Sequence, residues 1–115
     1  MKLFRWEGGR QAGGYEKMQL AKGPRFDLFM IRYRCGASVA PHVDPAPPGW
    51  RHFRANLMLR APRRGGRLAL DKAIYAGRRL TIFRPDQNTH WVTTVEEGSR
   101  LMLSLGWLRP GGGQG

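Results

Sequence analysis

Three side chains in this sequence have the types and spacing of metal ligands. His42 and Asp44 lie two residues apart in the stretch PHVDP, and His90 begins the later stretch HWVTTV. Residues two apart in an extended chain point to the same side, with their backbones about 6–7 Å apart. Two imidazoles and one carboxylate can hold non-haem Fe(II) while leaving coordination positions open. His-x-Asp alone is also typical of an ordinary turn with a capping aspartate, so the surrounding elements must decide between the two interpretations.

Short alternating or β-rich stretches separated by turn residues recur along the chain. They predict strands at 25–34, 53–60, 67–71, 79–85, 90–95 and 100–108. The clearest alternation is FRANLMLR, 53–60. It places Phe53, Ala55, Leu57 and Leu59 on one face, and Arg54, Asn56, Met58 and Arg60 on the other. The stretches 61–66 and 96–99 are predicted turns.

The pattern of strands and turns predicts an all-β sandwich or barrel with little or no helix. The prolines of 41–50 exclude a helix or a central strand there. At 115 residues we expect a single domain over 1–115. It divides into N-terminal strands at 1–25, a core at 26–108 and a flexible tail at 109–115.

The charge balance is strongly basic, with 20 Lys and Arg against 8 Asp and Glu. Arginine pairs well with phosphate and carboxylate, so an anionic partner such as nucleic acid or an acidic peptide is one interpretation, and a solvated basic surface is the other. The exposed clusters to test are Arg63, Arg64, Arg67, Arg78 and Arg79. No apolar run reaches the ~20 residues of a membrane span and no signal peptide is evident, so we expect a cytoplasmic protein away from membranes. The single Cys35 permits no internal disulfide and no cysteine-based zinc site.

A longer frame of residues resembles a known family. His42-x-Asp44, the later GGRLAL, and the run from Phe83 to Arg100, F-x-P-x-x-x-x-H-x-V-x-x-V-x-x-G-x-R, are similar to the Fe(II)- and 2-oxoglutarate-dependent dioxygenases, nearest the prolyl-hydroxylase-like subgroup with its bacterial and phage relatives. The resemblance covers about 26–108. It implies a double-stranded β-helix, a distorted jelly roll of cupin-like type, and hydroxylation of a C–H bond with O2 as co-reactant.

The resemblance also implies roles for individual residues. His42, Asp44 and His90 match the iron ligands, and Arg100 matches the basic residue that pairs with the far carboxylate of 2-oxoglutarate. Further cosubstrate-pocket residues implied by the resemblance are Tyr33, Asn56 and Met58. Met58 stands where the prolyl-hydroxylase pattern has a tyrosine, so Asn56 or Arg54 could supply the second carboxylate contact. Tyr33 also suits a packed strand aromatic.

Charge counting agrees with this ligand set. Fe(II) with two neutral histidines and one carboxylate carries about +1, a 2-oxoglutarate dianion brings the site to −1, and one buried arginine brings it to zero. We expect the substrate to be a protein or amino-acid side chain. Nucleic acid is the alternative, and a non-catalytic cupin-like metal-binding protein is a further one.

Several other expectations concern the surface and the packing. His52 is expected on the surface, Trp50 at the substrate rim, and Trp91 and Trp107 in the core or pocket wall. The apolar face of 53–60 needs a cover. We expect that cover to come from residues 1–25 or from a second copy of the chain in a homodimer.

Overall fold

β-strand is the only regular secondary structure in the described part of the chain. The structure, a computed structural model, describes residues 3–8 and 13–111. Its strands are β1 (Trp6–Gly8), β2 (Glu16–Lys22), β3 (Phe26–Tyr33), β4 (Val39–His42), β5 (Trp50–Arg60), β6 (Arg64–Gly65), β7 (Leu68–Leu70), β8 (Ala73–Ala76), β9 (Leu80–Phe83), β10 (His90–Val92), β11 (Val95–Glu97) and β12 (Arg100–Pro110). These residues therefore contain no helix of the length and apolar character that a membrane span requires.

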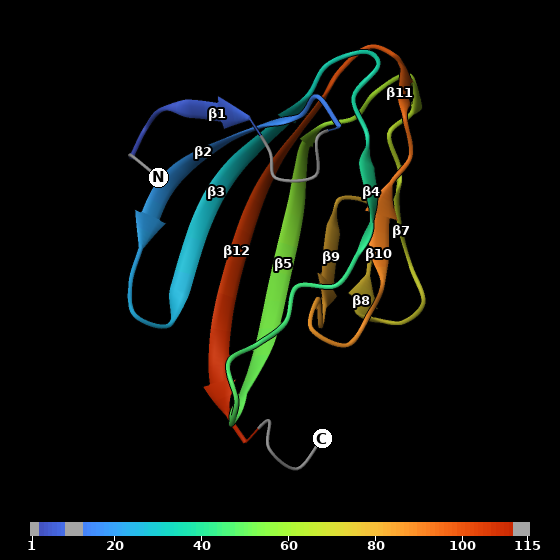
Figure 1. Cartoon of the computed structure of the whole chain (residues 1–115). Coiled ribbons are helices and arrows are strands. Elements are labelled where there is room, and N and C mark those ends of the chain that lie inside the picture. Colours follow the sequence, from blue (N-terminus) through green and yellow to red (C-terminus); the bar gives the residue numbers. More distant parts are fainter. Residues whose placement is uncertain (1–2, 9–12, 112–115) are drawn as a thin grey trace.

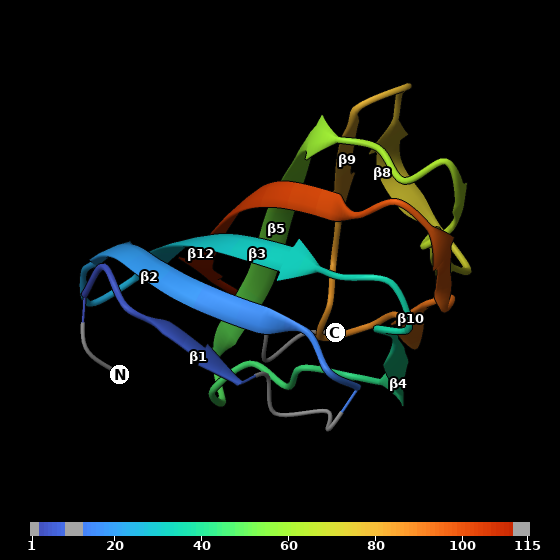
Figure 2. The same ribbon diagram turned by 90° about the horizontal axis from the view of Figure 1, so that it is seen from above.

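The strands form one large sheet and two small ones. The large sheet has seven strands in the order β1-β2-β3-β12-β5-β9-β8, and all its named neighbours are antiparallel (Figure 1). A three-stranded sheet, β4-β10-β7, and the pair β11-β6 complete the fold. Seen from above, the large sheet curves, with β4 and β10 lying on one side of it (Figure 2). The described strands confirm the predicted all-β class.

The apolar core lies between the sheets. Its buried members come from all three sheets, from the loop after β3 and from the residue before β2: Tyr15, Ile31, Tyr33, Ala37, Val39, Val92, Val95 and Met102. Phe29 and Leu68 pack against this cluster from the edge of the cavity described below. Most of these buried side chains also line that cavity, so the core forms part of its wall.

The two faces of the large sheet have an unusual division of polarity. On β5, Asn56 is 6% exposed and faces the interior, whereas Leu57 and Leu59 are 38% and 42% exposed. Leu105 on β12 is also exposed, and β1 and β2 extend the sheet at its β3 edge. Within the described residues the N-terminal strands therefore do not cover the apolar face. The homodimer stays a prediction for that face.

Several strand boundaries differ from those predicted. The stretch 90–95 is two strands, β10 and β11, because Thr93 and Thr94 carry the chain from the three-stranded sheet to the pair with β6. The predicted turns at 61–66 and 96–99 contribute to β6 and β11, and the short strand β8 was missed. β5 begins at Trp50 and β12 continues to Pro110. Of the predicted tail, 112–115 lies outside the described residues.

The turn after β9 is held by a two-pronged ion pair between Arg84 and Asp86. Arg84 Nε donates to Asp86 Oδ1 at 2.9 Å and Nη2 donates to Oδ2 at 2.7 Å. The backbone N–H of His52 on β5 also donates to Oδ2, at 3.3 Å. Burial raises the pKa of Asp86, but the bonds from Arg84 and His52 outweigh it, so this pKa lies below its ordinary value.

We expect Asp86→Asn to lower the free energy of unfolding by about 1.5–3 kcal/mol at pH 7, because charge-assisted hydrogen bonds are lost. A depressed carboxyl pKa stabilises the fold above the unfolded-state value of about 3.9, and this contribution disappears as pH falls through the folded-state value. Urea unfolding at pH 7 and pH 3 checks both points: the gap in unfolding free energy between wild type and variant should narrow in acid. Asp71→Asn, at an exposed bend, is the matched control and should leave stability nearly unchanged. An equal gap at both pH values would contradict this account.

Candidate metal and anion site

The structure brings together the three residues of the predicted metal site. His42 ends β4, His90 begins β10, and these two residues are paired in register across the two antiparallel strands. Asp44 follows β4, and its backbone N–H donates to Pro85 O at 2.9 Å. Asp44 Oδ1 lies 3.6 Å from His42 Nε2 and Oδ2 lies 3.4 Å from His90 Nε2. One ligand atom from each residue lies within 4.8 Å of the others, a spacing that one ion can bridge.

The outer nitrogens of both histidines are tied to backbone carbonyls. His42 Nδ1 lies 2.7 Å from Ala40 O, and His90 Nδ1 lies 2.8 Å from Asn88 O. A carbonyl can only accept, so each Nδ1 carries the proton and each Nε2 presents a lone pair toward Asp44. Such outer bonds orient histidine ligands in metal sites. The rings are therefore pre-set in the tautomer that metal binding needs.

The aspartate is held in its charged form. Burial raises the pKa of Asp44, but its close contacts with His90 and His42 and the charge of Arg54 outweigh that effect, so the pKa lies below its ordinary value. His90 is 6% exposed and its ring meets Phe83 edge-on, with ring centroids 5.1 Å apart. A carboxylate and two neutral imidazoles are thus ready in a partly dry pocket.

The triad opens into a cavity of about 470 Å³ between the sheets. Strands β2, β3, β5, β10 and β12 line it, and so does Arg100 at the start of β12. The apolar part of the lining includes Phe29, Ile31, Val92 and Leu68. A cavity of this size accommodates small organic ligands.

Arg100 is the most unusual charge in this cavity. It is 2% exposed, and none of the described carboxylates forms an ion pair with it. Its Nη2 donates to the Met102 thioether, at 3.4 Å, and its Nε and Nη1 are buried with no hydrogen-bond partner. Burial lowers the pKa of Arg100. A buried guanidinium without an anion is costly, so this side chain is built to receive one.

The three other predicted pocket residues all lie near Arg100. The ring of Tyr33 lies under its guanidinium, 4.8 Å from centroid to carbon, and stacks on Tyr15 in the core. Asn56 lines the cavity but accepts a hydrogen bond from Ser104 Oγ, at 2.6 Å. Met58 lines an adjoining cavity of about 260 Å³, which shares Asn56, Leu68, Arg100 and Met102 with the first. Tyr33 is therefore both a packed aromatic and a pocket residue.

His52 and an Asp27–Arg54 pair lie in the cavity, where the sequence pattern did not predict them. His52 is half-buried and lines the cavity, rather than lying on the surface. Arg54 also lines it and pairs with Asp27 on β3 at 2.8 Å. The alternation of 53–60 placed Arg54 beside Asn56 on the polar face, but no local signal marked Asp27 as its partner. Only the pairing of both β3 and β5 with β12 joins them.

The tryptophans have separate environments. Trp91 lines the cavity. Trp107 stacks on Phe53, with ring centroids 5.7 Å apart. Trp50 begins β5 beneath the Arg25 guanidinium and is not part of the cavity lining, so the structure does not place it at a substrate rim.

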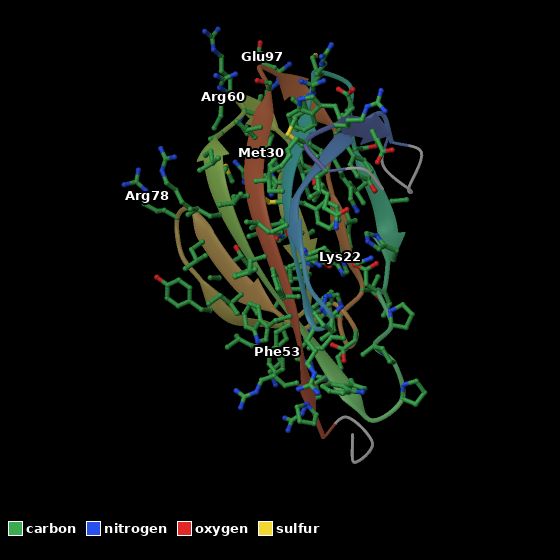
Figure 3. All side chains as sticks on the ribbon, turned by 90° about the vertical axis from the view of Figure 1, so that its left-hand side faces the viewer. Lys22, Met30, Phe53, Arg60, Arg78 and Glu97 are labelled. Atoms are coloured by element: carbon green, nitrogen blue, oxygen red, sulfur yellow. The ribbon has the colours of Figure 1, made fainter. Side chains whose placement is uncertain are left out.

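Members of the two predicted arginine clusters, 63–67 and 78–79, line the same cavity. Arg67, Arg78 and Arg79 line the smaller cavity, whose described lining has no acidic residue. Arg78 projects away from the β8–β9 turn, and Arg60 and Glu97 both lie at the same end of the molecule (Figure 3). Arg64 approaches Glu96, at 3.5 Å. Binding of nucleic acid or an acidic peptide by these arginines stays a prediction.

Comparison with known proteins gives structural likeness only. No family model and no curated protein matches the sequence. Among solved structures, a prolyl-4-hydroxylase from Pseudomonas putida matches with TM-score 0.68 and 19% identity over 93% of this chain and 78% of that chain. The viral collagen prolyl hydroxylase from Paramecium Bursaria Chlorella virus-1, in its 2OG complex, matches with TM-score 0.60 and 15% identity over 84% and 78%.

A cupin barrel without a hydroxylase name matches as well. The Cupin 2 conserved barrel domain protein from Salinispora arenicola has TM-score 0.54 and 17% identity over 85% of this chain and 79% of that chain. At these identities the likenesses establish architecture. The chain has the cupin-like double-stranded β-helix fold that prolyl hydroxylases share.

Proposed function

We propose that this chain is an Fe(II)- and 2-oxoglutarate-dependent dioxygenase that hydroxylates a C–H bond of a protein or amino-acid side chain. The observation that carries the proposal is Arg100, whose Nε and Nη1 are buried without a partner in the cavity that also contains the His42, Asp44 and His90 cluster. A cavity with a metal-ligand cluster and an unpaired arginine fits an anion that also contacts the metal. 2-Oxoglutarate has a carboxylate at one end for the arginine and oxygen atoms at the other end for the metal.

The residues fit the implied metal and cosubstrate. His42 and His90 would supply Nε2 lone pairs and Asp44 a carboxylate oxygen, which is the donor set of a facial Fe(II) site. Arg100 would bind the distal carboxylate, and Tyr33 would hold the guanidinium in place through its ring face. Phe29, Ile31 and Val92 would keep water from the space between the metal ligands and Arg100. The bound iron, with 2-oxoglutarate and O2, would supply the oxidising chemistry.

The test is spectroscopic. Anaerobic addition of Fe(II) and then 2-oxoglutarate to the full chain should produce a visible metal-to-ligand charge-transfer band, and succinate should form once O2 is admitted. Iron binding without any band would overturn the proposal. That result would favour the cupin-like metal-binding alternative, which the Salinispora arenicola likeness supports.

A further inference from the structure

A row of polar side chains crosses the interior face of three adjacent strands in the candidate site's cavity. Asp27 on β3, Gly106 on β12 and Arg54 on β5 are paired in register. Arg54 Nη2 donates to Asp27 Oδ1 at 2.8 Å, passing over the central strand. A Cβ at Gly106 would lie 2.1 Å from Arg54 Nη2 and 2.9 Å from Asp27 Oδ1. The ion pair thus depends on a glycine beneath it.

Ser104 and Asn56 lie two residues from Gly106 and Arg54 on β12 and β5, and they hold the Arg54 side chain in place. Arg54 Nη1 donates to Ser104 Oγ at 2.8 Å, and Ser104 Oγ donates to Asn56 Oδ1 at 2.6 Å. Ser104 is 0% exposed and Asn56 is 6% exposed. A buried network of this kind holds its members in one geometry. The guanidinium of Arg54 is therefore pre-positioned, like the recognition groups of a binding site.

Asp27 has no task in the proposed metal and cosubstrate chemistry, and with Arg100 on the distal carboxylate that chemistry does not require Arg54. An ion pair on a cavity wall is a weak source of stability, because desolvating two charges offsets much of their attraction. The side chains keep some exposure, 14% for Arg54 and 31% for Asp27. Both line the cavity that contains the triad, and the charge of Arg54 reaches Asp44. They are accessible to a molecule that lies beside the metal cluster.

We infer that Asp27 and Arg54 form the recognition site for a free α-amino acid, the side chain of which lies toward the metal cluster. A zwitterion carries a carboxylate and an ammonium group on one carbon, and the adjacent cation and anion of Arg54 and Asp27 match these two charges. Arg54 binds the carboxylate and Asp27 the ammonium, through charge-assisted hydrogen bonds. A residue inside a peptide has neutral amides at both positions, so it offers neither a carboxylate to Arg54 nor an ammonium group to Asp27. The inference rests on the proposed function for the reaction and narrows its substrate.

The test begins with amino-acid binding to the full, metal-free chain, and nuclear magnetic resonance is used to monitor the binding. The twenty proteinogenic L-amino acids are titrated singly. The best binder is then compared with its decarboxylated amine, its deaminated acid and its N-acetyl amide. We expect each derivative to bind about 10- to 100-fold more weakly, because each loses one or both charge-assisted contacts.

Variants assign each charge to its partner. Asp27→Asn should reduce the preference for the amino acid over the deaminated acid, which lacks the ammonium group. Arg54→Gln should reduce the preference for the amino acid over the amine, which lacks the carboxylate. Each comparison follows the logic of a double-mutant cycle. Gly106→Ala leaves both charges in the chain but displaces them. It should weaken binding of the amino acid by at least about 10-fold. Gly8→Ala is its control, because a Cβ at Gly8 meets nothing within 4 Å. Thermal unfolding of each variant separates lost binding from lost fold.

The outcomes distinguish this inference from the proposed function. A charge-transfer band with no amino-acid binding, or an N-acetyl amide that binds as tightly as the free amino acid, overturns the inference and leaves the dioxygenase proposal in place. Amino-acid binding with the expected variant pattern but no band overturns the dioxygenase proposal alone.

Discussion

Replacing Arg100 by methionine is expected to weaken 2-oxoglutarate binding strongly and, at the same time, to stabilise the ligand-free protein. The guanidinium is buried with two unpartnered nitrogens, so without an anion it contributes a desolvation cost and few bonds. Replacing buried charges by apolar groups of similar volume is often neutral or stabilising by about 1–4 kcal/mol. Loss of a buried charge partner costs a bound anion about 2–5 kcal/mol, so 2-oxoglutarate affinity should fall by roughly 30-fold or more.

Calorimetric titration of the Fe(II)- or Zn(II)-loaded protein measures the affinity, and urea unfolding of the metal-free protein measures the stability. Arg84→Met is the matched control, because Arg84 is paired with Asp86 and its loss strands a carboxylate. The control should lose stability and keep 2-oxoglutarate affinity. Unchanged affinity in Arg100→Met would refute the anchoring role, and a large loss of its stability would show that Arg100 is structurally satisfied.

Replacing His90 by alanine is expected to remove most Fe(II) affinity, by at least about 100-fold. Even the outer partners of metal ligands contribute about 10- to 100-fold, and His90 offers a direct Nε2 donor. The variant keeps His42 and Asp44, so it tests whether the three residues act as one set. Anaerobic Fe(II) titration or Zn(II) competition measures the loss.

Truncation of a buried ring also leaves a cavity beside Phe83, so His90→Gln, which retains most of the volume, belongs beside the alanine variant. His52→Ala is the control histidine, since it lines the same cavity but is not part of the cluster. Its iron affinity should stay within a few-fold of wild type. If His90→Ala binds iron as wild type does, or if His52→Ala loses it equally, the three-ligand assignment is wrong.

The parts of the fold that the sequence predicted are those encoded by local pattern. Alternation over 53–60 and the β-rich segments 25–34 and 100–108 correspond to β5, β3 and β12, the long central strands of the large sheet. Their length leaves room for a clear period of two, which short strands lack. The two-residue β6 and the four-residue β8 are set by their pairing partners, and β10 and β11 were merged because no local signal marks a change of sheet.

The features of the site can likewise be separated into those found from the sequence and those found only from the structure. His42 and Asp44 could be found by spacing, and His90 and Arg100 by the frame that resembles the dioxygenases. That Arg100 has no partner is a property of its surroundings, and it could come only from the structure. Asp27 and Arg54 are far apart in the chain, and they meet because β12 enters the sheet between β3 and β5. Sequence spacing carries no information about that insertion.

The glycine beneath the Asp27–Arg54 pair has a consequence for how this chain can evolve. Positions 27, 54 and 106 are held together by one contact, so a substitution at one alters the effect of substitutions at the others. Alanine at 106 is harmful while both charges are present, since its methyl group takes their space. In a chain that has first exchanged Arg54 for a short side chain, the same alanine fills an empty gap. Epistasis of this kind predicts covariation: among homologues, a side chain at 106 should accompany the loss of the charge pair across it.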